Sequence, residues 1–124
     1  MICLLLCEIC VSQTTFQKTF QAPGMNGGLH IQQTSDGGFI VVGQHEGAPG
    51  AGDCDEYIFK RDGCGNFEWF KTYGGGAGDG GLCIRQTPDG GYIVSGLTTL
   101  AGFGAWDISL MKIDAGGNVQ WFRT

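Results

Sequence analysis

The feature that most constrains this chain is an internal repeat. The segment IQQTSDGGFIVVG in the first half returns as IRQTPDGGYIVSG 53 positions later. Over residues 16–43 aligned with 69–96, 14 of 28 positions are identical. A second block, residues 55–72 aligned with 107–124 at an offset of 52, has 8 of 18 positions identical. The chain is therefore expected to contain the same structural unit twice.

Two turn signatures recur in each copy. The first is Asp-Gly-Gly between two apolar runs, and the second is a longer Asp-x-x-Gly-Asn. Aspartate supplies side-chain capping and glycine a positive φ, which is the chemistry of a tight hairpin. The residues of the first signature are Asp36, Gly37 and Gly38 in one copy and Asp89, Gly90 and Gly91 in the other. The second signature begins at Asp62 and at Asp114.

The segments around these turns predict four antiparallel strands per copy and almost no helix. Phe39–Val42 and Tyr92–Val94 are apolar on both faces, which is typical of a strand that is covered on both sides. Trp69 and Trp121 recur in the fourth strand, where a large ring can pack against a neighbouring unit. The expected strands cover residues 29–34, 38–45, 56–61 and 67–73, then 82–87, 91–98, 108–113 and 119–124.

This pattern predicts an all-β fold made of β-propeller blades, about two of them, incomplete and open. A flatter β-sandwich or solenoid built from the same hairpins is the alternative. Because a closed propeller has typically about four to eight blades, we expect a segment of a longer array. Two stacked units alone should be marginally stable or self-associate through their exposed blade faces.

The combined motif W-x-K-T-Y-G-G, T-x-D-G-G-Y-I-V-x-G and D-x-x-L-x-K-x-D-x-x-G-N-x-x-W resembles the propeller-like tandem repeats of secreted cell-surface proteins of bacteria and archaea, Bacteroidetes type. The resemblance implies an extracellular or surface-attached β-propeller and no known reaction. The matching residues are Trp69, Lys71, Thr72, Tyr73, Thr87, Asp89, Gly90, Gly91, Tyr92, Ile93, Val94, Gly96, Asp107, Leu110, Lys112, Asp114, Gly117, Asn118 and Trp121.

Residues 1–13 differ from the rest of the chain. A short apolar run over Ile2–Leu6 and the small Ser12 resemble the tail of a secretory signal peptide, although Glu8 interrupts the pattern. An ordinary buried N-terminal segment is the alternative. The run is too short to span a bilayer. The repeat region is expected over 14–124, with units at about 16–68 and 69–120 and a third unit beginning at 121–124.

The net charge of the chain restricts the classes of partner that it can bind. A net charge of −5 with 7 scattered basic residues argues against nucleic acid, which needs clustered cations. We expect a non-catalytic binding or structural module with an unknown extracellular protein or glycan as partner. The alternative is a fragment of a propeller enzyme, quinoprotein-like or a hydrolase, whose active site lies in other blades.

Aspartates offer the only candidate metal ligands. Asp53, Asp55 and Asp62 are weak calcium candidates, since calcium takes about six to eight oxygen ligands and no loop has that density. The aspartates of the two turn signatures are better explained as caps. We therefore expect no metal site and no cofactor, with calcium as the weaker alternative.

No catalytic residue is expected either. Active sites of propellers are made by residues that break the repeat, and His30 and His45 do so, but neither has a nucleophile motif nearby. Cys54, Cys64 and Cys83 contain no C-x-x-C motif and are interpreted as incidental.

Overall fold

A computed structural model of the chain describes residues 17, 19, 26–46, 54–74, 77–99 and 106–124. These residues form two four-stranded antiparallel sheets, with strands in chain order and no helix among them. The first sheet contains β1 (Asn26–Gln33), β2 (Phe39–Glu46), β3 (Cys54–Arg61) and β4 (Phe67–Tyr73). The second contains β5 (Asp79–Gln86), β6 (Tyr92–Thr98), β7 (Asp107–Ile113) and β8 (Val119–Arg123).

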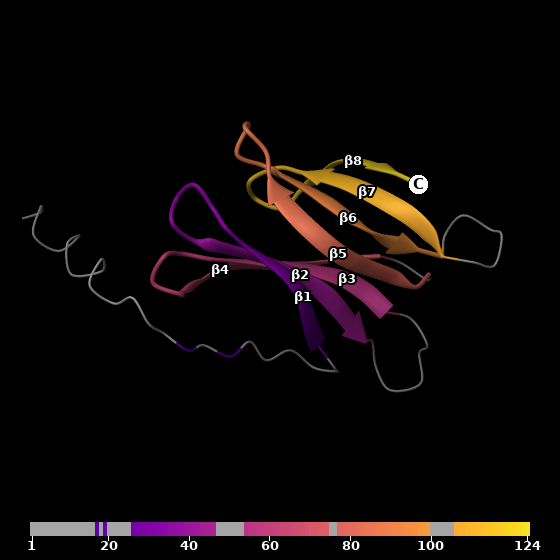
Figure 1. Cartoon of the computed structure of the whole chain (residues 1–124), viewed down its shortest axis with the longest axis horizontal. Coiled ribbons are helices and arrows are strands. Elements are labelled where there is room, and N and C mark those ends of the chain that lie inside the picture. The colour runs from indigo at the N-terminus through magenta and orange to yellow at the C-terminus, as the bar shows by residue number, and fades with distance from the viewer. Residues whose placement is uncertain (1–16, 18, 20–25, 47–53, 75–76, 100–105) are drawn as a thin grey trace, which may run out of the picture.

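One sheet lies against the other, with β5 next to the first three strands (Figure 1). The expectation of an all-β fold with four antiparallel strands per copy is confirmed for the described residues. In these ranges there is no helix able to span a membrane. Residues 1–13, expected to be a leader, lie outside the described residues.

Strands β1 and β5 begin three residues earlier than predicted, at Asn26 and Asp79. The glycines there read as turn signals, but they continue the ladder, because Gly81 pairs with Gly96. A Cβ on Gly81 would overlap Val42 and lie 2.8 Å from Glu56 Cδ. Glycine is therefore needed here for the close approach of the two sheets.

The first turn of each copy is held by its aspartate. Asp36 accepts a hydrogen bond from the Gly38 N–H at 2.9 Å, and Gly37 has a φ of 81°. The Lys60 ammonium donates to Asp36 at 2.9 Å, and this bond holds the pKa of Asp36 well below its usual value. The residues with the same arrangement in the second copy are Asp89, Gly90, Gly91 and Lys112.

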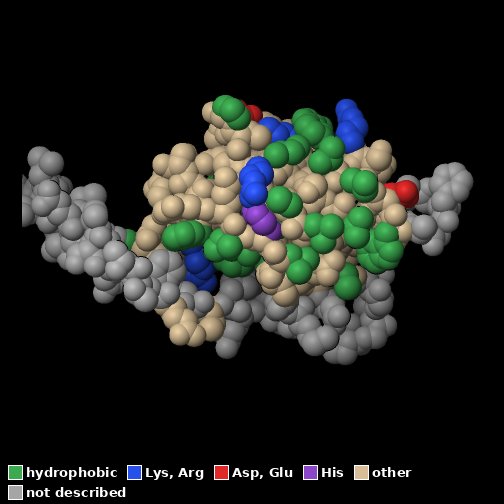
Figure 2. Space-filling model, viewed as in Figure 1, with side chains coloured by type: hydrophobic (Ala, Val, Ile, Leu, Met, Phe, Trp, Pro, Cys, Tyr) green, Lys and Arg blue, Asp and Glu red, His purple; other side chains and the backbone are tan. Residues whose placement is uncertain are grey.

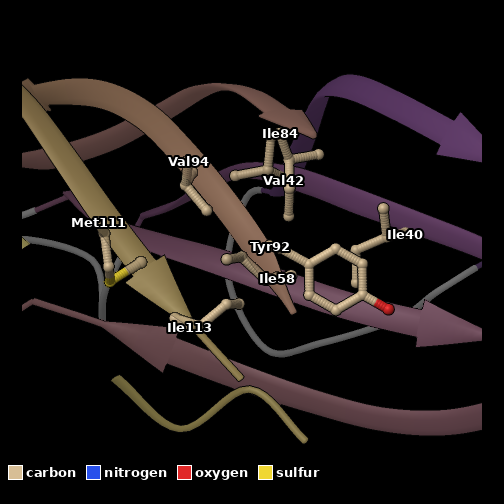
Figure 3. Close-up of a cluster of buried hydrophobic side chains, with 8 residues drawn as sticks. All are labelled: Ile40, Val42, Ile58, Ile84, Tyr92, Val94, Met111 and Ile113. Atoms are coloured by element: carbon tan, nitrogen blue, oxygen red, sulfur yellow. The ribbon is translucent and has the colours of Figure 1, made fainter. Parts of the chain in front are cut away.

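The core lies between the sheets. It is a single cluster of side chains that are at most 4% exposed, drawn from both sheets (Figure 3). The Tyr92 ring of the second sheet points toward Ile40 of the first (Figure 3), and Trp69 packs against Tyr92 with ring centroids 6.4 Å apart. The cluster consists of Ile40, Val42, Ile58, Ile84, Tyr92, Val94, Met111 and Ile113.

Other large apolar side chains reach the surface. Figure 2 shows one face of the molecule, where hydrophobic side chains emerge at many places and charged ones are few. Trp121 is 39% exposed, whereas Trp69, its equivalent in the first copy, is partly buried and packs against the core. The two copies therefore have the same strands, but equivalent side chains are not equally buried.

The repeat supplies a matched pair for testing the core. Ile84→Ala should lower the free energy of unfolding by about 2–5 kcal/mol, because Ile84 is fully buried and its removal leaves a cavity. Ile31 is the equivalent residue of the first copy and is 61% exposed, so Ile31→Ala should cost less than about 1 kcal/mol. Urea unfolding followed by tryptophan fluorescence measures both. Equal losses would contradict this assignment of the core.

Candidate functional site

A cavity of about 380 Å³ opens between the two sheets. It lies at the end of the core where β3 and β4 face β7 and β8. Among the described residues that line it, two are acidic and none is basic. The lining consists of Glu56, Thr72, Tyr73 and Gly74 from the first sheet or its end, with Asp79, Ser109, Met111, Val119 and Phe122 from the second.

Glu56 is the most unusual group of this lining. It lies in β3, one of the two middle strands of the first sheet, on the face toward the second sheet. Its side chain is only 5% exposed. Its Oε1 atom has no hydrogen-bond partner in the described part of the chain. Burial, with a smaller contribution from the charge of Asp79, raises the pKa of Glu56 to about 8. At neutral pH the carboxyl is therefore mostly protonated.

Two further carboxyl groups, those of Asp79 and Asp55, lie near Gly74. Asp79 is 7% exposed, and its Oδ2 has no partner within the described residues. Gly74 has a φ of 146°, and a Cβ placed there would lie 2.5 Å from Asp55 Oδ1 and 2.9 Å from Asp79 Oδ2. The glycine leaves a small space between these two carboxylates that any side chain would fill.

Glu56 breaks the repeat. Its equivalent in the second copy is Ile108, an apolar residue. The neighbouring Asp55, in contrast, has Asp107 at its equivalent position. The sequence contains a signal for Glu56, since an acid stands in one copy where the other has isoleucine.

The two histidines that break the repeat do not reach the cavity lining. His30 lies between the sheets, where its Nδ1 accepts from the Ile84 N–H at 3.4 Å and its Nε2 lies 2.8 Å from Arg85 Nη1. His45 is paired in register with Asp55. His30 therefore joins the two sheets.

The calcium candidates do not form one site. Asp53 lies outside the described residues. Asp62 caps its own turn, accepting from the N–H groups of Cys64 at 2.9 Å and Asn66 at 2.8 Å. Only Asp55 lies near the cavity. Within the described ranges, no three histidine, cysteine or acidic side chains are grouped to hold a metal ion.

The interpretation of the three cysteines as incidental is wrong for one of them. Cys64 is disulfide-bonded, whereas Cys54 and Cys83 are free thiols.

The raised pKa of Glu56 makes stability depend on pH. The folded chain holds the Glu56 proton up to about pH 8 and the unfolded chain only to 4.5, so stability is full below 4.5 and falls as pH rises through 8. Between these two pH values the free energy of unfolding should fall by at most about 1.4 kcal/mol per pH unit. Glu56→Gln should flatten this slope, as measured by urea unfolding at several pH values.

The matched control is Glu68→Gln, which makes the same chemical change on a carboxyl that is 40% exposed and paired with Lys60. It should leave the slope unchanged. An identical slope in the chain with Glu56→Gln would show that another group titrates in this window.

What the cavity can do chemically follows from these carboxyls. A protonated Glu56 next to Asp79 can donate and accept protons, and the same pair can neutralise a bound cation. Comparison with models of protein families and with curated proteins returned no match.

Proposed function

We propose that this chain is a non-catalytic β-propeller segment of a secreted or cell-surface protein, acting as a binding and structural module. Its sheets are units of a stack, and the loops at the ends of the stack hold an extracellular protein or a glycan. One observation carries the proposal: apolar positions that are buried on the first sheet have apolar equivalents on the exposed face of the second.

The covered face of the first sheet is apolar at its centre. Ile40 and Ile58 are 0% exposed there, because the second sheet covers them. Their equivalents in the second copy are Ile93 and Leu110, which lie on the face of the second sheet that points away from the first. This outer face is defined by Ile93, Leu97, Ile108, Leu110 and Trp121.

The outer face is not covered by the described chain. Ile108 is 72% exposed, Leu110 42% and Trp121 39%. In a two-sheet sandwich the outward residues of each strand are polar. An apolar outer face on a sheet whose other face is already in the core favours a stack of more than two sheets.

The packing has a direction. The second sheet covers the first with its Ile84, Val94 and Met111 side and offers its opposite side to a further sheet. Each sheet can therefore cover the one before it and be covered by the next. Repetition of one such head-to-tail contact closes a ring, as in a propeller, or extends into an open array.

The surface location is supported by the sequence. The repeat motif resembles that of secreted cell-surface proteins, and a segment like the end of a signal peptide precedes it. Glycan-array screening and pull-down from extracellular material, with the full chain as bait, test the binding role. Hydrolysis or quinone-dependent oxidation by the purified chain would contradict the non-catalytic assignment.

Self-association tests the stacking directly. The full chain should increase in mass with concentration across about a hundredfold range, because a second copy can cover the outer face. Ile108→Lys combined with Leu110→Lys should abolish the increase, since two charges would have to be desolvated in the contact. Sedimentation velocity measures the mass.

The control adds a lysine outside this face. Ala115 is exposed in the turn between β7 and β8, so Ala115→Lys should leave association unchanged. A chain that remains monomeric throughout and unfolds cooperatively would overturn the stacking proposal.

A further inference from the structure

We infer that the cavity beside Glu56 binds an alkylammonium group, either that of a small free amine or that of a lysine side chain. The ammonium would lie at the carboxyl groups of Glu56 and Asp79, and its alkyl chain against Met111, Val119 and Phe122. The cavity is formed by the two sheets of one chain, so this inference does not depend on stacking between copies.

The first reason is that buried acceptors lack donors. Glu56 Oε1 and Asp79 Oδ2 are each buried without a hydrogen-bond partner in the described part of the chain. A buried carboxylate oxygen left unpaired is costly, so a donor that enters the cavity stabilises it. An ammonium group brings three donors and a positive charge.

Two nearby donors of the chain, on Tyr73 and Lys71, are already engaged. Tyr73 lines the cavity, but its hydroxyl donates to the Gly117 carbonyl at 2.7 Å. Burial raises the pKa of Tyr73, so this hydroxyl keeps its proton at neutral pH. The Lys71 ammonium donates to Asn118 Oδ1 at 2.6 Å. Neither group supplies the hydrogen bond or the charge that the buried carboxyls lack.

The charges around Glu56 also favour a cationic ligand. Glu56 faces Asp79 of β5 and Ser109 of β7, has Gln44 and Tyr73 as its cross-strand neighbours, and follows Asp55 on its own strand. None of these groups is cationic. A bound cation would favour the ionised form of Glu56, so Glu56 would release its proton on binding.

The lining and the volume of the cavity favour an organic cation over a metal ion. No three ligating side chains of the described residues are grouped around one point, whereas calcium takes about six to eight oxygens. A volume of about 380 Å³ leaves room for an alkyl chain. Met111, Val119 and Phe122 offer apolar surface to its methylene groups.

Isothermal titration calorimetry of the full chain tests the inference with two probes. 1,5-Diaminopentane represents a free amine, and Nα-acetyl-lysine N-methylamide represents a lysine side chain. We expect saturable binding of at least one probe, and the one that binds identifies the source of the ammonium. Its affinity should rise by up to about tenfold per pH unit below the pKa of Glu56, because the ionised carboxyl binds the cation better.

Variants locate the site. Glu56→Gln keeps the volume of the side chain, and it should weaken binding at least about tenfold and remove the pH dependence. Asp79→Asn should weaken binding similarly. Glu68→Gln is the control, because Glu68 does not line the cavity, and it should bind like the unchanged chain. Circular dichroism checks that each variant is folded.

Three outcomes would overturn the inference. The first is that neither probe binds the folded chain. The second is that binding is the same after Glu56→Gln and after Asp79→Asn. The third is that calcium chloride binds while both amines do not, which would make the cavity a metal site.

Discussion

The structure depends on the packing of the apolar face of one sheet against the apolar face of the next. Strands β2 and β6 are apolar on both faces, so neither sheet can place one face in water without exposing large side chains. Between the sheets this requirement is met, and Ile40, Ile58 and Ile84 are completely buried. On the outer face of the second sheet it is not met by the described residues. The same residue pattern thus explains both the core and the exposed surface.

Close packing between the sheets is made possible by glycine and secured by side chains of β1. Gly80 and Gly81 bring β5 close to the first sheet, since a Cβ at either position would overlap it. As an edge strand, β5 presents backbone N–H groups with no neighbouring strand. Gln32 accepts from the Gln86 N–H at 2.8 Å, and His30 accepts from the Ile84 N–H. Polar side chains of one sheet therefore satisfy the edge of the next.

The sequence was informative wherever the two copies agree. The aspartate-glycine turns at Asp36 and Asp89 predicted the hairpins, because capping and positive φ are local properties that need no tertiary context. The starts of β1 and β5 could not be predicted in the same way. Glycine at positions such as Gly81 has the same local preferences in a turn and in a strand, and only the packing of another sheet distinguishes them.

The cavity was missed for a different reason. Glu56 lies in a strand whose alternation places it in the core, where an acid is unfavourable and Ile108 of the other copy is the ordinary choice. Isoleucine at position 56 would extend the apolar cluster into the cavity and remove the buried carboxyl. The chain instead carries an unpaired acid next to Asp79, at a cost that the second copy avoids. An expensive departure from its own repeat is the strongest argument that this position serves binding, because the scaffold alone would be more stable without it.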